Sequence, residues 1–186
     1  MQIERMDVQA LLALANQKED RLTGQITSAV RLGGTLDNPA ISLTGEIEEG
    51  ALASYPISDV VLDVALADRV LTIRKLSGTQ GDGSFSASGT GDFNGMMDVD
   101  ATANDIALGI FTGLAGIDEP VSGTASVTAH VGGTAQSPVA DVSLSAKNGG
   151  VRGGTFDALA GEIQVRGSVV RVNQLTVHKY IGGVDY

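Results

Sequence analysis

The chain contains no cysteine and no tryptophan, and its 186 residues include only four Phe and three Tyr. Without cysteine, a disulfide-stabilised scaffold and a thiolate metal site are both excluded. Surfaces that bind sugars or stack nucleobases depend on aromatic side chains, and this chain offers few of them. The function therefore has to come from aliphatic and small polar residues.

Basic residues are also scarce, because 12 Lys and Arg stand against 22 Asp and Glu, which gives a net charge of −10. Nucleic-acid binding needs clustered cations to displace condensed counterions, so no nucleic-acid partner is expected. Long apolar runs are missing too. The most apolar stretch, Ile106 to Ile117, is shorter than the roughly 20 residues that cross a bilayer, and no signal peptide is recognisable at the start. An apolar content of 42% still favours a folded core over disorder.

Catalytic and phosphate-binding motifs are absent from the sequence. The stretch at 83–89 resembles a nucleophile elbow only in composition, since its serine and glycine spacing is wrong. No phosphate-binding loop occurs, and the glycine clusters are better explained as turns. We therefore expect a protein that is not an enzyme and has no cofactor.

A metal site is not expected either. His130 and His178 are the only histidines, and they fall on separate predicted strands without a cysteine or a clustered carboxylate beside them. Asp98 and Asp100 share one strand face, but they lack the spacing of a calcium-binding loop. The simplest interpretation is that these polar residues lie on a solvated outer face.

Glycine, in contrast, is abundant, with 25 residues, and many of them recur at a fixed interval. Turn residues of the first half return 99 positions later in the second half. The pairs are Gly24 and Gly123, Gly33-Gly34-Thr35 and Gly132-Gly133-Thr134, Pro39 and Pro138, Gly50 and Gly149, and Gly83 and Gly182. Because glycine and proline mark where a backbone turns, this recurrence predicts a duplicated supersecondary unit.

Between these turns, apolar residues occupy every second position, as is typical of strands with one apolar and one wet face. Short turns such as Asp68-Arg69, Gly167-Ser168 and Asn94-Gly95 join the strands, so neighbouring strands must be antiparallel. The alternation assigns these residues to the inner face: Ile41, Leu43, Val60, Leu62, Val64, Leu66, Leu71, Ile73, Val142, Leu144, Ile163, Val165, Val170 and Val172.

Two segments instead show helical spacing, Asp7 to Ala15 and Asp105 to Leu114, and each opens with an Asp suited to a helix N-cap. We expect a first unit at 1–103 and a second unit at 104–186. Each unit begins with its helix and continues into about five or six antiparallel strands. The second unit stops early, so we expect a fragment of a longer repeat protein.

The predicted fold is therefore mainly β, a curved antiparallel sheet of duplicated units with two short helices. Its inner face can either close as the dry core of a sandwich or stay open as a trough. An open aliphatic trough suits acyl chains, because methyl groups bind them without directional demands. Small residues on that face leave room along the trough, namely Gly45, Gly161, Ala129, Ala140 and Ala146.

The order of these motifs is similar to that of a known superfamily. A short helix is followed by a strand that ends in Gly-Gly-Thr-x-x-x-Pro, at 33–39 and again at 132–138. A further strand reaches Glu-Gly-Ala-Leu at 49–52 or Gly-Gly-Val at 149–151, and a paired hairpin follows. This pattern resembles the AsmA-like superfamily, and most closely the TamB translocation and assembly module proteins. The resemblance covers essentially the whole chain.

The resemblance implies a β-taco groove in a periplasmic segment of an inner-membrane-anchored protein from a bacterium with two membranes. Such proteins are implicated in moving phospholipids between the membranes. They also work with an Omp85-type outer-membrane partner, through parts of the protein outside this fragment. No catalytic residues follow from the resemblance.

Three hypotheses result. The first is conduction of phospholipid acyl chains along the groove. The second is a translocation and assembly scaffold for outer-membrane β-barrel or autotransporter clients, and the third is a surface adhesin or passenger β-structure with a closed core. Because a cut repeat array exposes unpaired strand edges, end-to-end self-association of the fragment is also expected.

Overall fold

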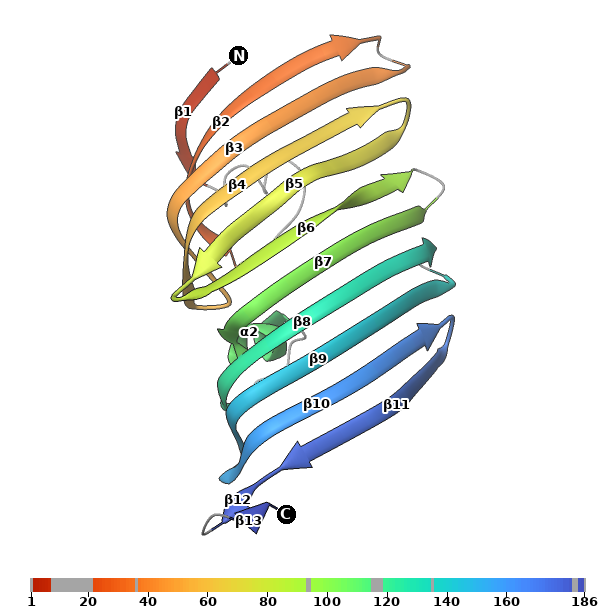
Figure 1. The fold of residues 1–186 in the computed structure, drawn as a ribbon. Coiled ribbons are helices and arrows are strands. Elements are labelled where there is room, and N and C mark those ends of the chain that lie inside the picture. Colours follow the sequence, from red (N-terminus) through yellow and green to blue (C-terminus); the bar gives the residue numbers. More distant parts are fainter. Residues whose placement is uncertain are drawn as a thin grey trace.

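The computed structural model describes residues 2–7, 22–35, 37–92, 95–114, 119–134, 136–181 and 184–185. They form one curved antiparallel sheet that does not close on itself and whose strand order follows the chain from β1 to β11 (Figure 1). The strands of this sheet are β1 (Gln2–Asp7), β2 (Leu22–Gly34), β3 (Pro39–Leu52), β4 (Tyr55–Ala67), β5 (Val70–Gln80), β6 (Gly83–Asp92), β7 (Met96–Ala107), β8 (Val121–Thr134), β9 (Pro138–Val151), β10 (Gly154–Arg166) and β11 (Val169–His178). The mainly-β prediction is confirmed.

Two further short strands, β12 (Tyr180–Ile181) and β13 (Val184–Asp185), pair separately from the main sheet. The described residues contain one helix, α2 (Leu108–Leu114), which joins β7 to the segment before β8. None of the described helices is long and apolar enough to span a bilayer.

Tight hairpins account for the strand order. Asp68 and Arg69 connect β4 to β5 with φ angles of 51° and 64°, and two positive φ angles are what a type I′ turn requires. At the end of β6, the Gly95 N–H donates to the Asp92 carbonyl at 3.0 Å, so the predicted hairpin there is confirmed. Because every connection between the strands from β2 to β6 is short, each strand must pair with its neighbour in sequence.

The strand bounds in the two halves follow the same interval as the turn residues. β3 and β4 begin at residues 39 and 55, and β9 and β10 begin at 138 and 154. One bulge agrees as well, since Arg74 in β5 and Asn173 in β11 are both skipped in the pairing with the preceding strand, whereas the second bulge between β4 and β5, between Ser58 and Val61, has no counterpart between β10 and β11. The same backbone irregularity therefore occurs at equivalent places.

The helix predicted from Asp105 to Leu114 is too long at its start. Asp105, Ile106 and Ala107 belong to β7, where Ile106 pairs with Ala125 of β8. Asp105 is a bulge residue with a φ of 51° whose N–H donates to Ser126 Oγ at 3.0 Å, not a helix cap. The bulge lets the strand continue past the point where the apolar spacing changes.

The helix predicted from Asp7 to Ala15 cannot be compared in full. Asp7 is the last residue of β1, and residues 8–15 lie outside the described part of the chain. β1 pairs with β2 in antiparallel orientation.

The core is small, and its two buried clusters lie on one face of the sheet. Ile26, Ile47, Ile57 and Val60 form one buried cluster. Ala103, Ile106 and Ile110 form a second cluster, through which α2 packs on β7. Among the described residues no second sheet covers this face, so the closed-sandwich alternative is not what this part of the chain forms.

Candidate functional site

Cross-strand pairing connects the residues of one face into rows that run across the sheet, and we call this face the apolar face. One row, the Val30–Val170 row, crosses ten strands from β2 to β11. Its members are Val30, Leu43, Val64, Ile73, Gly89, Val99, Val131, Ala140, Val165 and Val170. Residues paired directly across strands share a face, so this row is continuous.

A second row, the Ser28–Val172 row, runs beside the first. Its members are Ser28, Gly45, Leu62, Leu76, Ala87, Ala101, Ala129, Val142, Ile163 and Val172. Neither row contains a charged side chain, and Ser28 is the only polar residue in the two. The apolar face therefore offers an aliphatic surface that crosses strand after strand.

The structure places the fourteen predicted inner residues on this face. Five lie in the Val30–Val170 row and four in the Ser28–Val172 row. Ile41, Leu66 and Leu71 form part of a third row, Val60 pairs with Ile47, and Leu144 pairs with Val127. Strand parity was sufficient to assign the face, because each assignment needed only the alternation within its own strand.

Most of these side chains are half-buried. Val60 is 6% exposed, whereas Val170 and Val172 at the β11 end are 65% and 59% exposed. Contiguous exposed apolar surface marks a binding site for an apolar ligand or partner. The apolar face has this character, and its exposed apolar side chains include Leu32 on β2 and those along β11.

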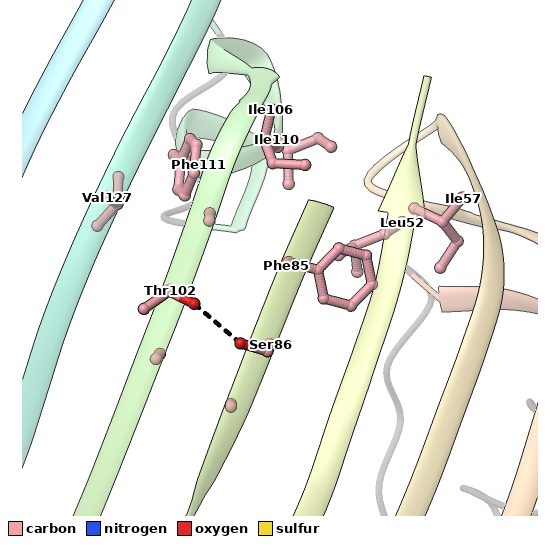
Figure 2. Close-up of a pocket in the computed structure, with 12 residues that line it drawn as sticks. Leu52, Ile57, Phe85, Ser86, Thr102, Ile106, Ile110, Phe111 and Val127 are labelled. Atoms are coloured by element: carbon pink, nitrogen blue, oxygen red, sulfur yellow. Dashed lines mark hydrogen bonds between the residues drawn. The ribbon is translucent and has the colours of Figure 1, made fainter. Parts of the chain in front are cut away.

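A pocket of about 210 Å³ lies on the apolar face beneath α2. Figure 2 shows Ile106 and Ile110 on one side of it and Phe85 and Leu52 on the other. An apolar cavity of about 150 Å³ is enough to bind benzene. The lining is almost entirely apolar and consists of Leu52, Ile57, Phe85, Ser86, Ala87, Ala101, Thr102, Ala103, Ile106, Ile110, Phe111 and Val127.

Sequence reasoning missed this pocket. Its walls come from residues far apart in the chain, such as Leu52 and Phe111, which only the register of the sheet and the packing of α2 bring together. The apolar spacing of the helix was the available signal. This spacing showed that the helix has an apolar side, but it did not show which strands that side packs against.

α2 is held close to the sheet by two contacts. The Ala107 N–H donates to Gln80 Oε1 at 2.9 Å just before the helix begins. Gly109 faces Tyr55 so closely that a Cβ at this position would collide with the ring. A larger residue than glycine would therefore require the Tyr55 side chain to move.

The expected room at Gly45 is not present. An added Cβ there would lie 2.7 Å from Ile26 Cδ1, because Ile26 already fills the space above this glycine. Gly161 is more open, since the nearest atoms to an added Cβ lie at 3.4 Å. The prediction that small residues leave room is therefore wrong at Gly45, where an aliphatic neighbour closes the gap.

On the opposite face, His130 does have carboxylates beside it, contrary to the prediction. His130 Nδ1 lies 2.9 Å from Asp100 Oδ1 and 3.8 Å from Asp98 Oδ1. The hydrogen bond to Asp100 raises the pKa of His130, and the charges of Asp98 and Asp141 act in the same direction. The register of β7 against β8 makes this cluster, which neither strand shows by itself.

Asp98, Asp100 and His130 are the described side chains that could offer ligand atoms to a metal ion, with those atoms within 4.8 Å of one another. All three are exposed. Exposed donors lose conformational freedom when they are fixed on an ion, and a His–Asp ion pair explains their proximity without one. We therefore treat the cluster as a surface ion pair.

Comparisons with protein-family models, curated proteins and solved structures found no match for this chain. The resemblance to the AsmA-like superfamily stays a prediction, carried by the spacing of turn residues. The apolar face and the pocket beneath α2 are the features from which a function can be argued.

Proposed function

We propose that the chain is a non-enzymatic, duplicated segment of a TamB-like envelope protein. In this proposal its apolar face is a groove that binds phospholipid acyl chains and lets them move between the inner and outer membranes. The observation that carries the proposal is the pair of uncharged rows that cross the sheet from β2 to β11.

The chemistry of the rows fits an acyl chain. Burial of apolar surface contributes roughly 25 cal/mol per Å² and has no directional requirement. Because ten strands about 4.8 Å apart span about 43 Å, an acyl chain can shift along the rows while keeping similar contacts. Ser28 is the only side chain of the two rows that can form a hydrogen bond, so a ligand that needs several hydrogen bonds would not find them there.

The proposed duplication fits the same function. Units that begin their strands at the same interval and carry the same bulge add length to a groove without changing its cross-section. Both rows pass from one half into the other, although residues 99 positions apart change row: Leu43 and Val64 lie in the Val30–Val170 row, and Val142 and Ile163 lie in the Ser28–Val172 row. Transport along a surface needs this continuity, whereas a single closed pocket does not.

The test is a pair of substitutions on adjacent residues of β4. Leu62 lies in the Ser28–Val172 row, and Val61 points to the opposite face, where it pairs with Glu46 and Ser77. Leu62→Asp should lower the affinity for a fluorescent fatty acid by about tenfold or more, because the carboxylate would lose hydration against the bound chain. Val61→Asp should leave the affinity close to that of the wild type.

Circular dichroism and urea unfolding establish that both variants fold, and native mass spectrometry measures the phospholipid that co-purifies with each. Unchanged fatty-acid affinity in a folded Leu62→Asp variant would sink the proposal. Equal loss in both variants would also contradict it, since that result would show a general effect of added charge.

A further inference from the structure

Two further pockets beside α2 meet at an ion pair. Arg152, in the turn between β9 and β10, donates from Nε and Nη2 to the two carboxylate oxygens of Glu119 at 2.9 and 2.8 Å. Because Glu119 lies just before β8, the pair joins that segment to the β9–β10 turn. Both pockets are lined by this pair together with Thr112, Val121 and Val151. The ion pair therefore lies at the boundary between them.

The first of these, which we call the Leu144 pocket, has a volume of about 430 Å³ and a mainly apolar wall. This volume lies in the range of about 300 to 1,000 Å³ that is typical of small-molecule sites. An apolar wall binds hydrocarbon without directional demands. The apolar side chains that line the pocket come from α2 and from three strands, and they are Leu108, Val121, Leu144, Ala146, Phe156 and Leu159.

The second, which we call the Ser122 pocket, has a volume of about 780 Å³ and a different wall. Four of its residues carry a hydroxyl group, and five are glycines, which leave backbone polar groups uncovered. The hydroxyl-bearing residues are Tyr55, Thr112, Ser122 and Thr155. A molecule that lies across both pockets therefore meets apolar surface at one end and polar groups at the other, as an amphiphile requires.

The ion pair keeps hydrogen-bonding capacity for a ligand. A guanidinium group has five N–H donors, and the contacts to Glu119 use one on Nε and one on Nη2. The Arg152 side chain is 75% exposed and that of Glu119 is 34% exposed, so both can be reached from solvent. Arginine binds phosphate oxygens, and a carboxylate can accept further hydrogen bonds from an ammonium group.

The charges select a zwitterion over an anion. A headgroup with one phosphate and one primary ammonium group complements an arginine and a glutamate that lie side by side. The net charge of −10 repels an anionic amphiphile, whereas a zwitterion has no net charge to be repelled. A quaternary ammonium group has no N–H to donate to Glu119, so the pair fits phosphoethanolamine better than phosphocholine.

The turn does not itself require an arginine. Arg152 and Gly153 have φ angles of 50° and 80°, and two positive φ angles are typical of a type I′ turn. The turn between β3 and β4, 99 positions earlier, has the same conformation with Ala53 and Ser54 at 50° and 72°. Small uncharged residues are therefore sufficient for this turn. What Arg152 adds is a cation where the two pockets meet.

We propose that the two pockets form one binding site for a phospholipid with a phosphoethanolamine headgroup. An acyl chain lies in the Leu144 pocket, the phosphate is bound by Arg152, and the ammonium group donates to Glu119. This inference rests on the proposed function, because it names the headgroup of the lipid whose acyl chains the apolar face binds.

The test compares three single-chain probes that share a lauroyl chain. They are lysophosphatidylethanolamine, the anionic lysophosphatidylglycerol, and monolauroylglycerol, which has no charged group. Calorimetric titration of the whole chain, below the critical micelle concentration of each probe, measures the affinities. Lysophosphatidylethanolamine should bind about tenfold more tightly than either of the others, because only its headgroup satisfies both members of the ion pair.

Three variants separate the headgroup from the chain. Arg152→Gln should lower the affinity for lysophosphatidylethanolamine about tenfold and leave that for monolauroylglycerol unchanged. Arg166→Gln is the matched control, since Arg166 also makes two contacts with a carboxylate, that of Asp141, but lines neither pocket. Glu119→Gln should shift the preference from lysophosphatidylethanolamine toward lysophosphatidylglycerol, because a carboxylate that repels the anion is removed. Loss of an ion pair that is merely structural would not change this preference.

Circular dichroism establishes that each variant folds. The headgroup preference, its loss in Arg152→Gln and its shift in Glu119→Gln together support the proposal. Equal affinities for the three probes, or equal effects of Arg152→Gln and Arg166→Gln, overturn it while leaving acyl-chain binding in place. Absence of binding by every probe contradicts the proposed function as well, so the two failures can be told apart.

Discussion

At the scale of single residues, two aromatic rings each lie over a glycine of the neighbouring strand. Phe85 lies over Gly78, and Phe156 lies over Gly149, so closely that a Cβ on either glycine would overlap the ring. A glycine in a strand lacks side-chain packing of its own, and a cross-strand ring compensates for that loss. Part of the high glycine content thus serves packing, although the sequence pattern pointed only to turns.

Gly78→Ala should destabilise the fold by about 1 to 3 kcal/mol, because the new methyl group must displace the Phe85 ring and Val60. Gly91→Ala is the matched control on the next strand, where the nearest atom to an added Cβ is Met96 O at 3.8 Å. This control should be neutral or slightly stabilising. Urea unfolding measures both, and equal effects would contradict the ring-on-glycine interpretation.

The ion pair of His130 gives a pH-dependent contribution to stability. Because the pKa of His130 is raised in the folded state by Asp100, the contribution is fully present below the ordinary histidine pKa of about 6.5 and is lost as the pH rises through the raised value. Asp100→Asn should therefore destabilise the protein more at pH 5.5 than at pH 8.5. The effect should be small, since all three side chains are exposed.

The same variant can be followed directly by NMR titration of the His130 ring. Asp100→Asn should lower the pKa of His130, whereas Asp82→Asn, in the turn between β5 and β6, should leave it as it is in the wild type. A His130 titration that does not respond to Asp100→Asn would show that the 2.9 Å contact does not persist in solution.

At the scale of elements, α2 shows how a short helix can depend on the sheet. Its seven residues are too few to form a stable helix alone in water. Ile110 is 4% exposed and anchors the helix in the cluster with Ala103 and Ile106. The stability of α2 therefore comes from packing and not from its capping residues.

Ile110→Ala should cost about 2 to 5 kcal/mol in the free energy of unfolding and enlarge the pocket beneath α2. Thr112→Ala, on the same helix, removes only a hydroxyl that donates to the Gly109 carbonyl at 3.1 Å and should cost about 1 kcal/mol. Urea unfolding compares the two variants. Similar small costs would show that α2 does not pack on the sheet as described.

The bounds of this helix also show where sequence reasoning fails. Ile106 fits the helical spacing of the segment, yet it pairs with Ala125 on β8. The bulge at Asp105 moves Ile106 onto the apolar face of the sheet. In the sequence, the position of Ile106 therefore fits the apolar spacing of a helix as well as that of a strand with a bulge. Apolar spacing alone could not distinguish the two, because the hydrogen-bond partners on β8 are distant in sequence.

At the scale of the whole molecule, the two rows turn a sheet of separate hairpins into one continuous surface. Leu43 of β3 and Val165 of β10 belong to the same row although 122 positions separate them in the sequence. If acyl chains move along the apolar face, they must contact both halves. If they are held only beneath α2, they contact a single place.

A photoreactive fatty acid should therefore crosslink to row residues of both halves, and peptide mapping by mass spectrometry would locate the adducts. Adducts on the strands at β3 and β4 as well as at β9 and β10 are expected, and Leu62→Asp should reduce those near β4. Adducts confined to the lining of the α2 pocket would contradict transport along the rows and indicate a fixed binding site instead.

The sequence by itself determined the strands, the tight turns and the side of each strand that is apolar. These properties depend on residues next to one another in the chain, so alternation and turn residues were enough to assign the fourteen residues to one face of the sheet. Only the tertiary structure decided what those faces build together. An unclosed sheet, the pocket beneath α2, the filled space at Gly45 and the carboxylates around His130 all depend on cross-strand register and on helix packing. These features bring together residues that are distant in sequence, and no local pattern encodes such contacts.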